Sequence, residues 1–228
     1  MAIMTPPETE GPQKRIFLVD DHPLVREWLT NLINQQPDLA VCGEAETGPQ
    51  AMQSILALRP DIAIVDISLK DSSGIELIKD LKQSLPSTLV LVLSMHEESH
   101  YAERALRAGA KGYIMKRETT RKVISAIRQV LAGGVYISEE IATSLAAQFV
   151  TGKTVSAGSP IEQLSDRELE VFELLGQGRG TRQIAEVLRV SVKTVQAYCA
   201  RIKEKLNLSS ATELLREAVR WYEATRKT

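Results

Sequence analysis

Residues 15–36, RIFLVDDHPLVREWLTNLINQQ, contain the pattern that decides the fold of the first part of the chain. A short apolar run is followed by two aspartates and then by apolar residues at helical spacing, namely Leu24, Trp28, Leu32 and Ile33. This pattern predicts a buried strand that leads directly into a helix. Because the same alternation continues to about residue 133, the sequence predicts an α/β domain.

Four further strands and four further helices follow the first pair in this region. The strands are expected at residues 39–46, 61–67, 88–94 and 111–115, and the helices at 49–58, 74–85, 98–109 and 119–133. Short, nearly continuous apolar strands that alternate with helices are typical of a parallel sheet covered on both faces. We therefore predict a doubly wound parallel sheet with right-handed crossovers.

The periodicity changes after residue 134, and only helical patterns appear from residue 161 onward. The stretch TGKTVSAGSP, residues 151–160, has the composition of a flexible linker. The first 14 residues are rich in Pro, Glu and Thr, which is typical of a disordered tail. We predict four parts: a tail at 1–14, the α/β domain at 15–134, a helix and flexible linker at 135–160, and a small all-α domain at 161–228.

The charge is distributed unevenly between the two predicted domains. The whole chain of 228 residues has a formal net charge of −1, which by itself would argue against nucleic-acid binding. Residues 1–150 have net charge −4 and residues 151–228 have +3, with a local excess of +5 between residues 178 and 208. Such a cluster is most often a solvated face, so charge alone only makes nucleic acid one candidate ligand of the helical domain.

Several classes of protein are excluded by other features of the sequence. No apolar run approaches the roughly 18 residues that span a bilayer, and the N-terminus lacks the pattern of a signal peptide. The two cysteines, Cys42 and Cys199, show no C-x-x-C spacing, so neither a disulfide scaffold nor a zinc site is indicated. We therefore expect a cytoplasmic protein that does not enter the membrane and has reduced thiols.

Polar side chains follow four of the predicted strands at their carboxyl ends, where open parallel sheets bind ligands. They are Asp20, Asp21, Asp66, Ser94 and Lys116. Each one alone has an ordinary explanation as a helix cap, a turn residue or a solvated surface group. Together, three carboxylates at one edge require a compensating cation, and oxygen donors select a hard ion such as Mg²⁺. A carboxylate beside Mg²⁺ and an ammonium group is arranged to attack a phosphoryl group.

This order and spacing resembles the receiver domain of two-component response regulators over about 120 residues. The resemblance implies strand order 2-1-3-4-5, with Asp66 as the phosphoacceptor and Lys116 as the phosphate-binding lysine. It also implies a Mg²⁺ site formed by Asp20, Asp21, Asp66 and the backbone carbonyl of Ser68.

The resemblance also assigns two switch residues, and the sequence differs from the family pattern at one position. Ser94 is implied to be the switch hydroxyl and Tyr113 the switch aromatic, although Tyr113 is equally well interpreted as a core aromatic. Lys70 stands where many receivers carry proline. The three histidines form no ligand or triad spacing, and His96 is given a role in dephosphorylation only by analogy.

The second domain resembles the helix-turn-helix domain of LuxR-type regulators of the NarL/FixJ subfamily, over about residues 161–223. The matching stretches are residues 164–172, 178–188 and 191–206. Ser165 and Glu168 form a capping-box pattern, and Ser191 is the expected N-cap of the recognition helix. Gly180 replaces a residue that is often serine in the family, which predicts a weaker cap on the preceding helix.

The recognition helix separates an apolar face from a polar face. We expect its core face to contain Val192, Val195, Cys199, Ile202 and Leu206. The expected DNA-contacting residues are Arg182, Lys193, Thr194, Gln196, Ala197, Arg201, Lys203 and Lys205. The alternative is a helical bundle that binds only protein and keeps these basic residues solvated.

The two resemblances together predict a phosphorylation-controlled transcription regulator. A sensor histidine kinase would transfer a phosphoryl group to Asp66, and the helix at 192–206 would bind double-stranded DNA as part of a homodimer. No enzymatic activity is expected beyond Mg²⁺-dependent self-phosphorylation and self-dephosphorylation. One hypothesis for control is that the unphosphorylated receiver masks the recognition helix; the alternative is direct promotion of the dimer.

Two other classes of function stay open at this point. One is a Mg²⁺-dependent phosphohydrolase with Asp66 as a transient nucleophile, which ordinarily needs a second acid nearby; the next carboxylate is Asp71, in a predicted loop. The other is a receiver that acts as an interaction module without phosphorylation. Such modules commonly lack an acidic or lysine position, whereas this sequence contains all of them.

Overall fold

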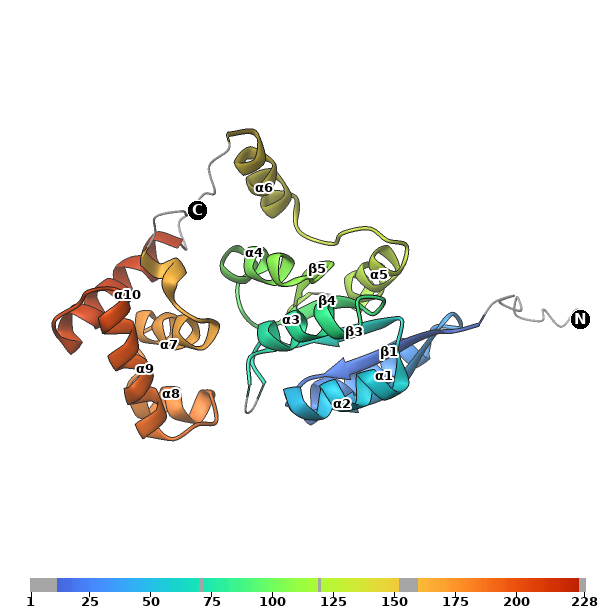
Figure 1. Ribbon diagram of the computed structural model, residues 1–228, viewed down its shortest axis with the longest axis horizontal. Coiled ribbons are helices and arrows are strands. Elements are labelled where there is room, and N and C mark those ends of the chain that lie inside the picture. Colours follow the sequence, from blue (N-terminus) through green and yellow to red (C-terminus); the bar gives the residue numbers. More distant parts are fainter. Residues whose placement is uncertain (1–11, 70–71, 119, 152–159, 226–228) are drawn as a thin grey trace, which may run out of the picture. The chain divides into compact units, whose positions relative to one another are not determined.

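The computed structural model describes residues 12–69, 72–118, 120–151 and 160–225 (Figure 1). The chain divides into two compact units, Met1–Thr143 and Ser144–Thr228. The first unit contains the parallel sheet and its helices. The helix α6 (Glu139–Thr151) crosses the boundary between the units, and among the described residues that follow it the regular elements are all helices. The predicted combination of an α/β domain with a small all-α domain is confirmed.

The sheet of the first unit has five parallel strands in the order β2-β1-β3-β4-β5, as predicted. The strands are β1 (Lys14–Val19), β2 (Leu39–Ala45), β3 (Ile62–Val65), β4 (Leu89–Ser94) and β5 (Gly112–Met115). The strand order reverses between β1 and β3, which are paired neighbours in the sheet. Ligands of open α/β sheets bind at the carboxyl ends of the strands beside such a reversal.

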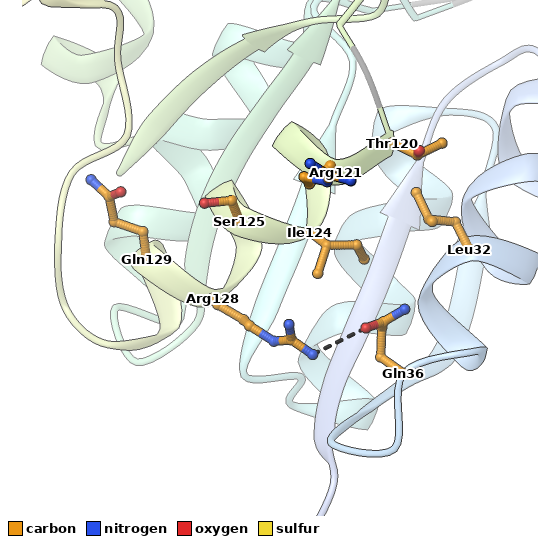
Figure 2. A pocket seen from close by; sticks show the side chains of 8 residues that line it. All are labelled: Leu32, Gln36, Thr120, Arg121, Ile124, Ser125, Arg128 and Gln129. Atoms are coloured by element: carbon orange, nitrogen blue, oxygen red, sulfur yellow. Dashed lines mark hydrogen bonds between the residues drawn. The ribbon is translucent and has the colours of Figure 1, made fainter.

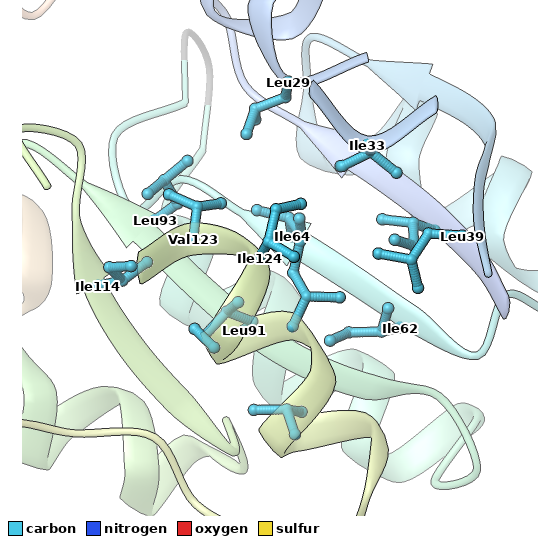
Figure 3. Packing of buried hydrophobic residues seen from close by; sticks show 14 of the residues in the cluster. Leu29, Ile33, Leu39, Ile62, Ile64, Leu91, Leu93, Ile114, Val123 and Ile124 are labelled. Atoms are coloured by element: carbon cyan, nitrogen blue, oxygen red, sulfur yellow. The ribbon is translucent and has the colours of Figure 1, made fainter. Parts of the chain in front are cut away.

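Five helices connect and cover these strands. They are α1 (Pro23–Asn34), α2 (Gly48–Leu58), α3 (Gly74–Ser84), α4 (Glu98–Ala108) and α5 (Thr120–Leu131). Alternate strand residues such as Ile16, Leu18, Ile62 and Ile64 pack with Leu29 of α1 and with residues of α5 in one apolar cluster (Figure 3). Because side chains alternate across a strand, their neighbours face the other side of the sheet, which is the side of α2, α3 and α4.

The turn from β3 into α3 requires a glycine beside the acidic strand end. Gly74 is the first residue of α3, and its N–H donates to the backbone oxygen of Ile67 at 2.7 Å. A Cβ atom at this position would collide with the backbone oxygen of Asp66. Ser73 caps α3 by accepting a hydrogen bond from the N–H of Ile75 at 3.2 Å. The sequence Ser73-Gly74 therefore permits the close approach of α3 to Asp66.

A short segment between α5 and α6 pairs with the outer edge of β5. The N–H of Tyr136 donates to the oxygen of Lys111 at 3.0 Å, and the N–H of Tyr113 donates to the oxygen of Tyr136 at 2.8 Å. The N–H of Ser138 then donates to Glu98 of α4 at 2.9 Å. We predicted a helix from residue 135, which is wrong by four residues: α6 begins at Glu139 because residues 135–138 form these other hydrogen bonds.

The described residues 160–225 of the second unit form a short 3-10 helix, η1 (Pro160–Gln163), and four α-helices. They are α7 (Asp166–Gly176), α8 (Thr181–Val187), α9 (Val192–Lys205) and α10 (Ala211–Thr225). α9 packs against both α7 and α8, and α10 packs against α7. The ring of Trp221 on α10 lies 5.6 Å from that of Phe172 on α7, centroid to centroid. This arrangement matches the predicted helix-turn-helix form.

The predicted helix caps of this unit are confirmed. Ser165 and Glu168 form the reciprocal capping box, with hydrogen bonds of 3.4 Å and 2.8 Å. The hydroxyl of Ser191 accepts from the N–H of Thr194 at 3.0 Å. Gly180 contributes no side-chain cap to α8; its N–H donates to the side-chain oxygen of Gln183 at 2.9 Å, and its carbonyl oxygen accepts from the N–H of Ile184 at 3.0 Å. α8 thus begins without a side-chain N-cap, while the expectation that it is capped less strongly stays a prediction.

Three predictions at the margins of the domains need correction or lie outside the described residues. Lys14, which we placed in the disordered tail, is the first residue of β1 and forms an ion pair with Asp61 at 3.0 Å. Val192, which we predicted in the core, is 36% exposed at the first position of α9, whereas Val195, one turn further along, is fully buried. Lys70, Asp71, most of the predicted tail and most of the predicted linker are outside the described residues.

Candidate functional site

The carboxyl ends of the sheet strands bring the predicted acidic residues and Lys116 together. Asp20 and Asp21 follow β1, Asp66 follows β3, and Lys116 follows β5. Strand pairing fixes their backbone, since the N–H of Asp66 donates to Val19 at 2.8 Å and the N–H of Lys116 donates to Ser94 at 2.8 Å. The three aspartates are all buried, with exposed fractions between 3% and 7%.

Lys116 bridges two of these carboxylates. Its Nζ lies 2.5 Å from Oδ2 of Asp20 and 2.6 Å from Oδ2 of Asp66, and the lysine side chain is only 7% exposed. Charged groups buried to this extent are stable only when they are paired. The ammonium group therefore holds the two carboxylates together against their mutual repulsion.

Burial and neighbouring charges shift the pKa values of this pair. Burial raises the pKa of Asp66 above its ordinary value; Asp20 adds to the rise, while Lys116 and His96 oppose it. For Lys116, desolvation acts to lower the pKa, but the carboxylates of Asp66 and Asp20 outweigh it and the pKa is raised. Lys116 consequently stays protonated at neutral pH, and a second cation at the site would favour the ionised form of Asp66.

The donor set fits a hard divalent cation. Ligand atoms of Asp20, Asp21, His22 and Asp66 all lie within 4.8 Å of one another. Three of the four donors are carboxylate oxygens, which Mg²⁺ prefers. Ser68, predicted to add its carbonyl, lies in the loop after β3, where its N–H is 3.4 Å from Oδ1 of Asp66. The acidic cluster is consistent with a Mg²⁺ site.

The two predicted switch residues lie beside this cluster and are linked through His96. Ser94 is fully buried at the end of β4, and its hydroxyl accepts from the N–H of His96 at 3.3 Å. The hydroxyl of Tyr113 donates to the backbone oxygen of His96 at 2.9 Å, and its side chain is 1% exposed. The buried position of Tyr113 agrees with both interpretations of this residue.

The polar face predicted for the recognition helix lies on α9 and the start of α8. The exposed residues among those predicted to contact DNA are Arg182, Lys193, Gln196, Ala197, Arg201 and Lys205, while Thr194 and Lys203 are half-buried. The guanidinium carbon of Arg201 lies 5.1 Å from the ring centroid of Tyr198. Stacking on a ring holds a guanidinium group in place without removing its hydrogen-bond donors.

Lys205 has a partner within the helical unit. Its Nζ lies 2.6 Å from Oε2 of Glu168, which is 2% exposed, and 3.0 Å from the backbone oxygen of Gln163. The ammonium group thereby connects the end of α9 to the beginning of α7. We predicted that Lys205 contacts a DNA phosphate. In this structure its ammonium group is instead bonded within the helical unit, to Glu168 and Gln163.

Comparison with known proteins gives matches over both units. The family described as "Response regulator receiver domain" matches residues 16–128, and "Bacterial regulatory proteins, luxR family" matches residues 162–218. "Oxygen regulatory protein NreC" of Staphylococcus carnosus is 40% identical over 210 residues, which are 90% of this chain and 97% of the relative. The chain is a LuxR-type response regulator.

Solved structures of other response regulators resemble this one. A LuxR-family two-component response regulator from Aurantimonas sp. SI85-9A1 is 36% identical with TM-score 0.56, covering 61% of this chain and 99% of that chain. RcsB from Salmonella enterica serovar Typhimurium is 25% identical with TM-score 0.57, covering 90% of this chain and 98% of that chain. This response regulator is accordingly a phosphorylation-controlled, DNA-binding transcription regulator of the LuxR/NarL family, a family of non-enzymatic transcription factors.

His22 and Arg26 contact the acidic site although we did not predict them there, and His96, which had a role only by analogy, contacts it as well. Nδ1 of His22 lies 2.7 Å from Asp21, and Nε2 of His96 lies 2.7 Å from the hydroxyl of Ser68. Arg26 contacts the backbone of Asp20 at 2.6 Å. The signals available in the sequence were the position of His22 directly after the aspartate pair and that of His96 two residues after Ser94.

The response regulator also has a groove of about 700 Å³ between α1 and α5 (Figure 2). Leu32 and Ile124 form part of its wall, and Arg128 of α5 donates to Gln36 at 3.1 Å across it. None of the predicted site residues lines this groove. The helices in the described part of the chain include none with the length and hydropathy of a membrane-spanning segment.

Proposed function

We propose that this response regulator accepts a phosphoryl group on Asp66 from a sensor histidine kinase. The observation that carries the proposal is the position of Lys116, whose Nζ bridges the buried carboxylates of Asp20 and Asp66. A carboxylate oxygen of Asp66 attacks phosphorus, the bond from phosphorus to the kinase histidine breaks, and that histidine nitrogen keeps the bonding electron pair. Lys116 then neutralises charge on the transferred phosphoryl oxygens.

Asp20, Asp21, Asp66 and the backbone carbonyl of Ser68 would hold Mg²⁺ at this site. When bound, Mg²⁺ supplies a second positive charge for the phosphoryl oxygens. The aspartates orient the site, and their burial limits access of water to the acyl phosphate. The hydroxyl of Ser94, which accepts from the N–H of His96 in this structure, donates a hydrogen bond to a phosphoryl oxygen after transfer. The only catalysis assigned to the chain is its own phosphorylation and dephosphorylation.

We also propose which residues bind double-stranded DNA. Lys193, Arg201 and Lys203 contact phosphates, and Gln196 and Ala197 contact base edges in the major groove. Arg182, in the first turn of α8, and Thr194, in the first turn of α9, lie where helix-turn-helix proteins contact the DNA backbone. The proposed active form is a homodimer on paired half-sites. The structure of RcsB bound to a promoter in the presence of a phosphomimetic supports the proposed binding of DNA by the phosphorylated form.

The phosphoacceptor is tested by replacing Asp66 with asparagine, which keeps the size of the side chain and removes the nucleophilic carboxylate. Wild-type protein and the Asp66→Asn variant are incubated with Mg²⁺ and acetyl phosphate, and incorporation is measured by intact-protein mass spectrometry. We expect one phosphoryl group on the wild type and loss of at least nine tenths of the labelling in Asp66→Asn.

The matched control is Asp80→Asn, which makes the same chemical change at an exposed position of α3. It should be labelled like the wild type. Undiminished labelling of Asp66→Asn, with unchanged labelling of Asp80→Asn, would contradict the assignment of Asp66.

A further inference from the structure

Arg26 is a buried cation on α1 for which the proposed phosphoryl transfer provides no role. Its side chain is 8% exposed, and arginine is almost never buried unless it is paired. Its Nη1 donates to the backbone oxygen of Asp20 at 2.6 Å, and its Nη2 donates to Glu46 at 2.8 Å. Its Nε lies 3.5 Å from the carboxylate of Glu44. The guanidinium group thus spans the ends of β1 and β2.

These contacts fix the peptide unit at the beginning of the acidic turn. The N–H of Asp20 donates to the backbone oxygen of Ala45 at 3.1 Å, so Asp20 is held on the β2 side by that bond and on the α1 side by Arg26. The same residue places its carboxylate on Lys116. With both backbone polar groups of Asp20 bonded, its Cα atom is held at the position from which the carboxylate reaches Lys116.

Arg26 can influence Mg²⁺ affinity in two ways, through its positive charge and through its contact with the backbone of Asp20. These two effects would change the affinity in opposite directions. A nearby cation repels Mg²⁺, so a purely electrostatic role would weaken metal binding. A backbone clamp preorganises the carboxylates, so a positioning role would strengthen metal binding. The contacts favour the clamp, because the guanidinium group meets the backbone oxygen of Asp20, while its charge is paired with Glu44 and Glu46.

We propose that Arg26 is a positioning residue for the proposed Mg²⁺ site. It fixes the turn after β1 so that Asp20 and Asp21 present their carboxylates to the divalent cation and to Lys116. This inference rests on the proposed function of the acidic cluster. Through Arg26, which does not bind the metal itself, α1 would thereby increase the affinity of the site for Mg²⁺.

The test measures Mg²⁺ affinity by isothermal titration calorimetry with magnesium chloride and the full chain. Arg26→Gln removes the charge and the fork of donors, whereas Arg26→Lys keeps the charge but cannot bridge the same two acceptors. We expect the dissociation constant for Mg²⁺ to rise about tenfold in Arg26→Gln and several-fold in Arg26→Lys. Arg121→Gln, the same change at an exposed position of α5, should leave the constant unchanged.

The sign of the change decides between the two roles. Equal or tighter Mg²⁺ binding by Arg26→Gln, or unchanged binding by Arg26→Lys, would overturn the inference. Protection of the β4 and β5 amides from hydrogen exchange confirms that each variant retains the sheet, and Arg26→Lys is the variant to use if Arg26→Gln fails to fold. A wild-type protein that neither binds Mg²⁺ nor becomes phosphorylated would instead overturn the proposed function.

Discussion

At the scale of single residues, Lys116 supplies the positive charge that compensates the carboxylates of the acidic site. It is the ammonium group between Asp20 and Asp66, and burial already raises the pKa of Asp66. Replacing Lys116 with methionine keeps much of the volume and removes the charge. The pKa of Asp66 then rises further, because desolvation and Asp20 are no longer opposed by the lysine.

The expected result is a pH-dependent loss of stability in Lys116→Met. A carboxyl group whose pKa is higher in the folded state than in the unfolded state destabilises the fold as the pH rises through that range. The variant should therefore have an unfolding free energy about 3 kcal/mol below that of the wild type at pH 8, and the difference should shrink toward pH 4. Hydrogen exchange of the slow amides of β1 and β3 measures it. Lys111→Met, at an exposed position just before β5, is the matched control, and a pH-independent difference would refute the prediction.

At the scale of secondary-structure elements, the helical unit has basic residues that we propose to contact DNA and others that form contacts within the unit. Lys193 is exposed on the first turn of α9, where the proposed role is a phosphate contact. Replacing Lys193 with alanine should weaken DNA binding to a similar extent for all sequences. The slope of log affinity against log salt concentration should fall by about one.

Fluorescence anisotropy with labelled duplexes at a series of salt concentrations provides the measurement for Lys193→Ala. Arg216→Ala removes one positive charge from an exposed position on α10 and should leave the salt slope within error. Equal slopes for Lys193→Ala and the wild type would remove Lys193 from the proposed interface.

The ion pair between Glu168 and Lys205 stabilises the contact of α7 with α9. Burial acts to raise the pKa of Glu168, but the bonds from Lys205 and from the N–H of Ser165 outweigh it, so the pKa is lowered. A carboxylate with a lowered pKa stabilises the fold above the unfolded-state value, here 4.5, and loses that contribution as the pH falls through its folded-state value.

Replacing Glu168 with glutamine tests this contribution. The variant should lose about 1 kcal/mol of unfolding free energy at pH 7, a small value because Lys205 is partly exposed, and the difference should disappear toward pH 3. Urea unfolding followed by the fluorescence of Trp221 in a Trp28→Phe chain measures it. Glu223→Gln, at an exposed position of α10, is the control, and a difference from the wild type that persists at pH 3 would contradict the prediction.

At the scale of the whole molecule, the two units have opposite net charges, −4 for residues 1–150 and +3 for residues 151–228. This asymmetry motivates the hypothesis that the unphosphorylated receiver masks α9. Under this hypothesis, phosphorylation of the full chain should increase hydrogen exchange of residues 192–206 in the absence of DNA. Mass-spectrometric exchange with and without acetyl phosphate provides the measurement, and Asp66→Asn provides the control. Equal protection in both states would favour direct promotion of the dimer.

Much of the fold was predictable because its signals are local. Alternating apolar strands and 3.6-residue helical periodicity identified all five strands, and the caps at Ser165 and Ser191 were visible as short motifs. The start of α6 was not predictable in this way, because Tyr136 and Ser138 bond to β5 and α4 and leave the helical pattern. The exposure of Val192 was missed for a related reason: periodicity gives the face of a helix but not how far along its length a neighbour covers it.

The sequence by itself determined the architecture and the order of Asp20, Asp66, Ser94 and Lys116 along the chain, because parallel strands bring their carboxyl ends to one edge of a sheet. Only the tertiary structure decided the pairings at that edge. The bridge from Lys116 to Asp66 joins residues 50 positions apart, and the contact of His96 with Ser68 joins residues 28 apart. Such contacts depend on how distant segments pack in three dimensions, and no local periodicity specifies them.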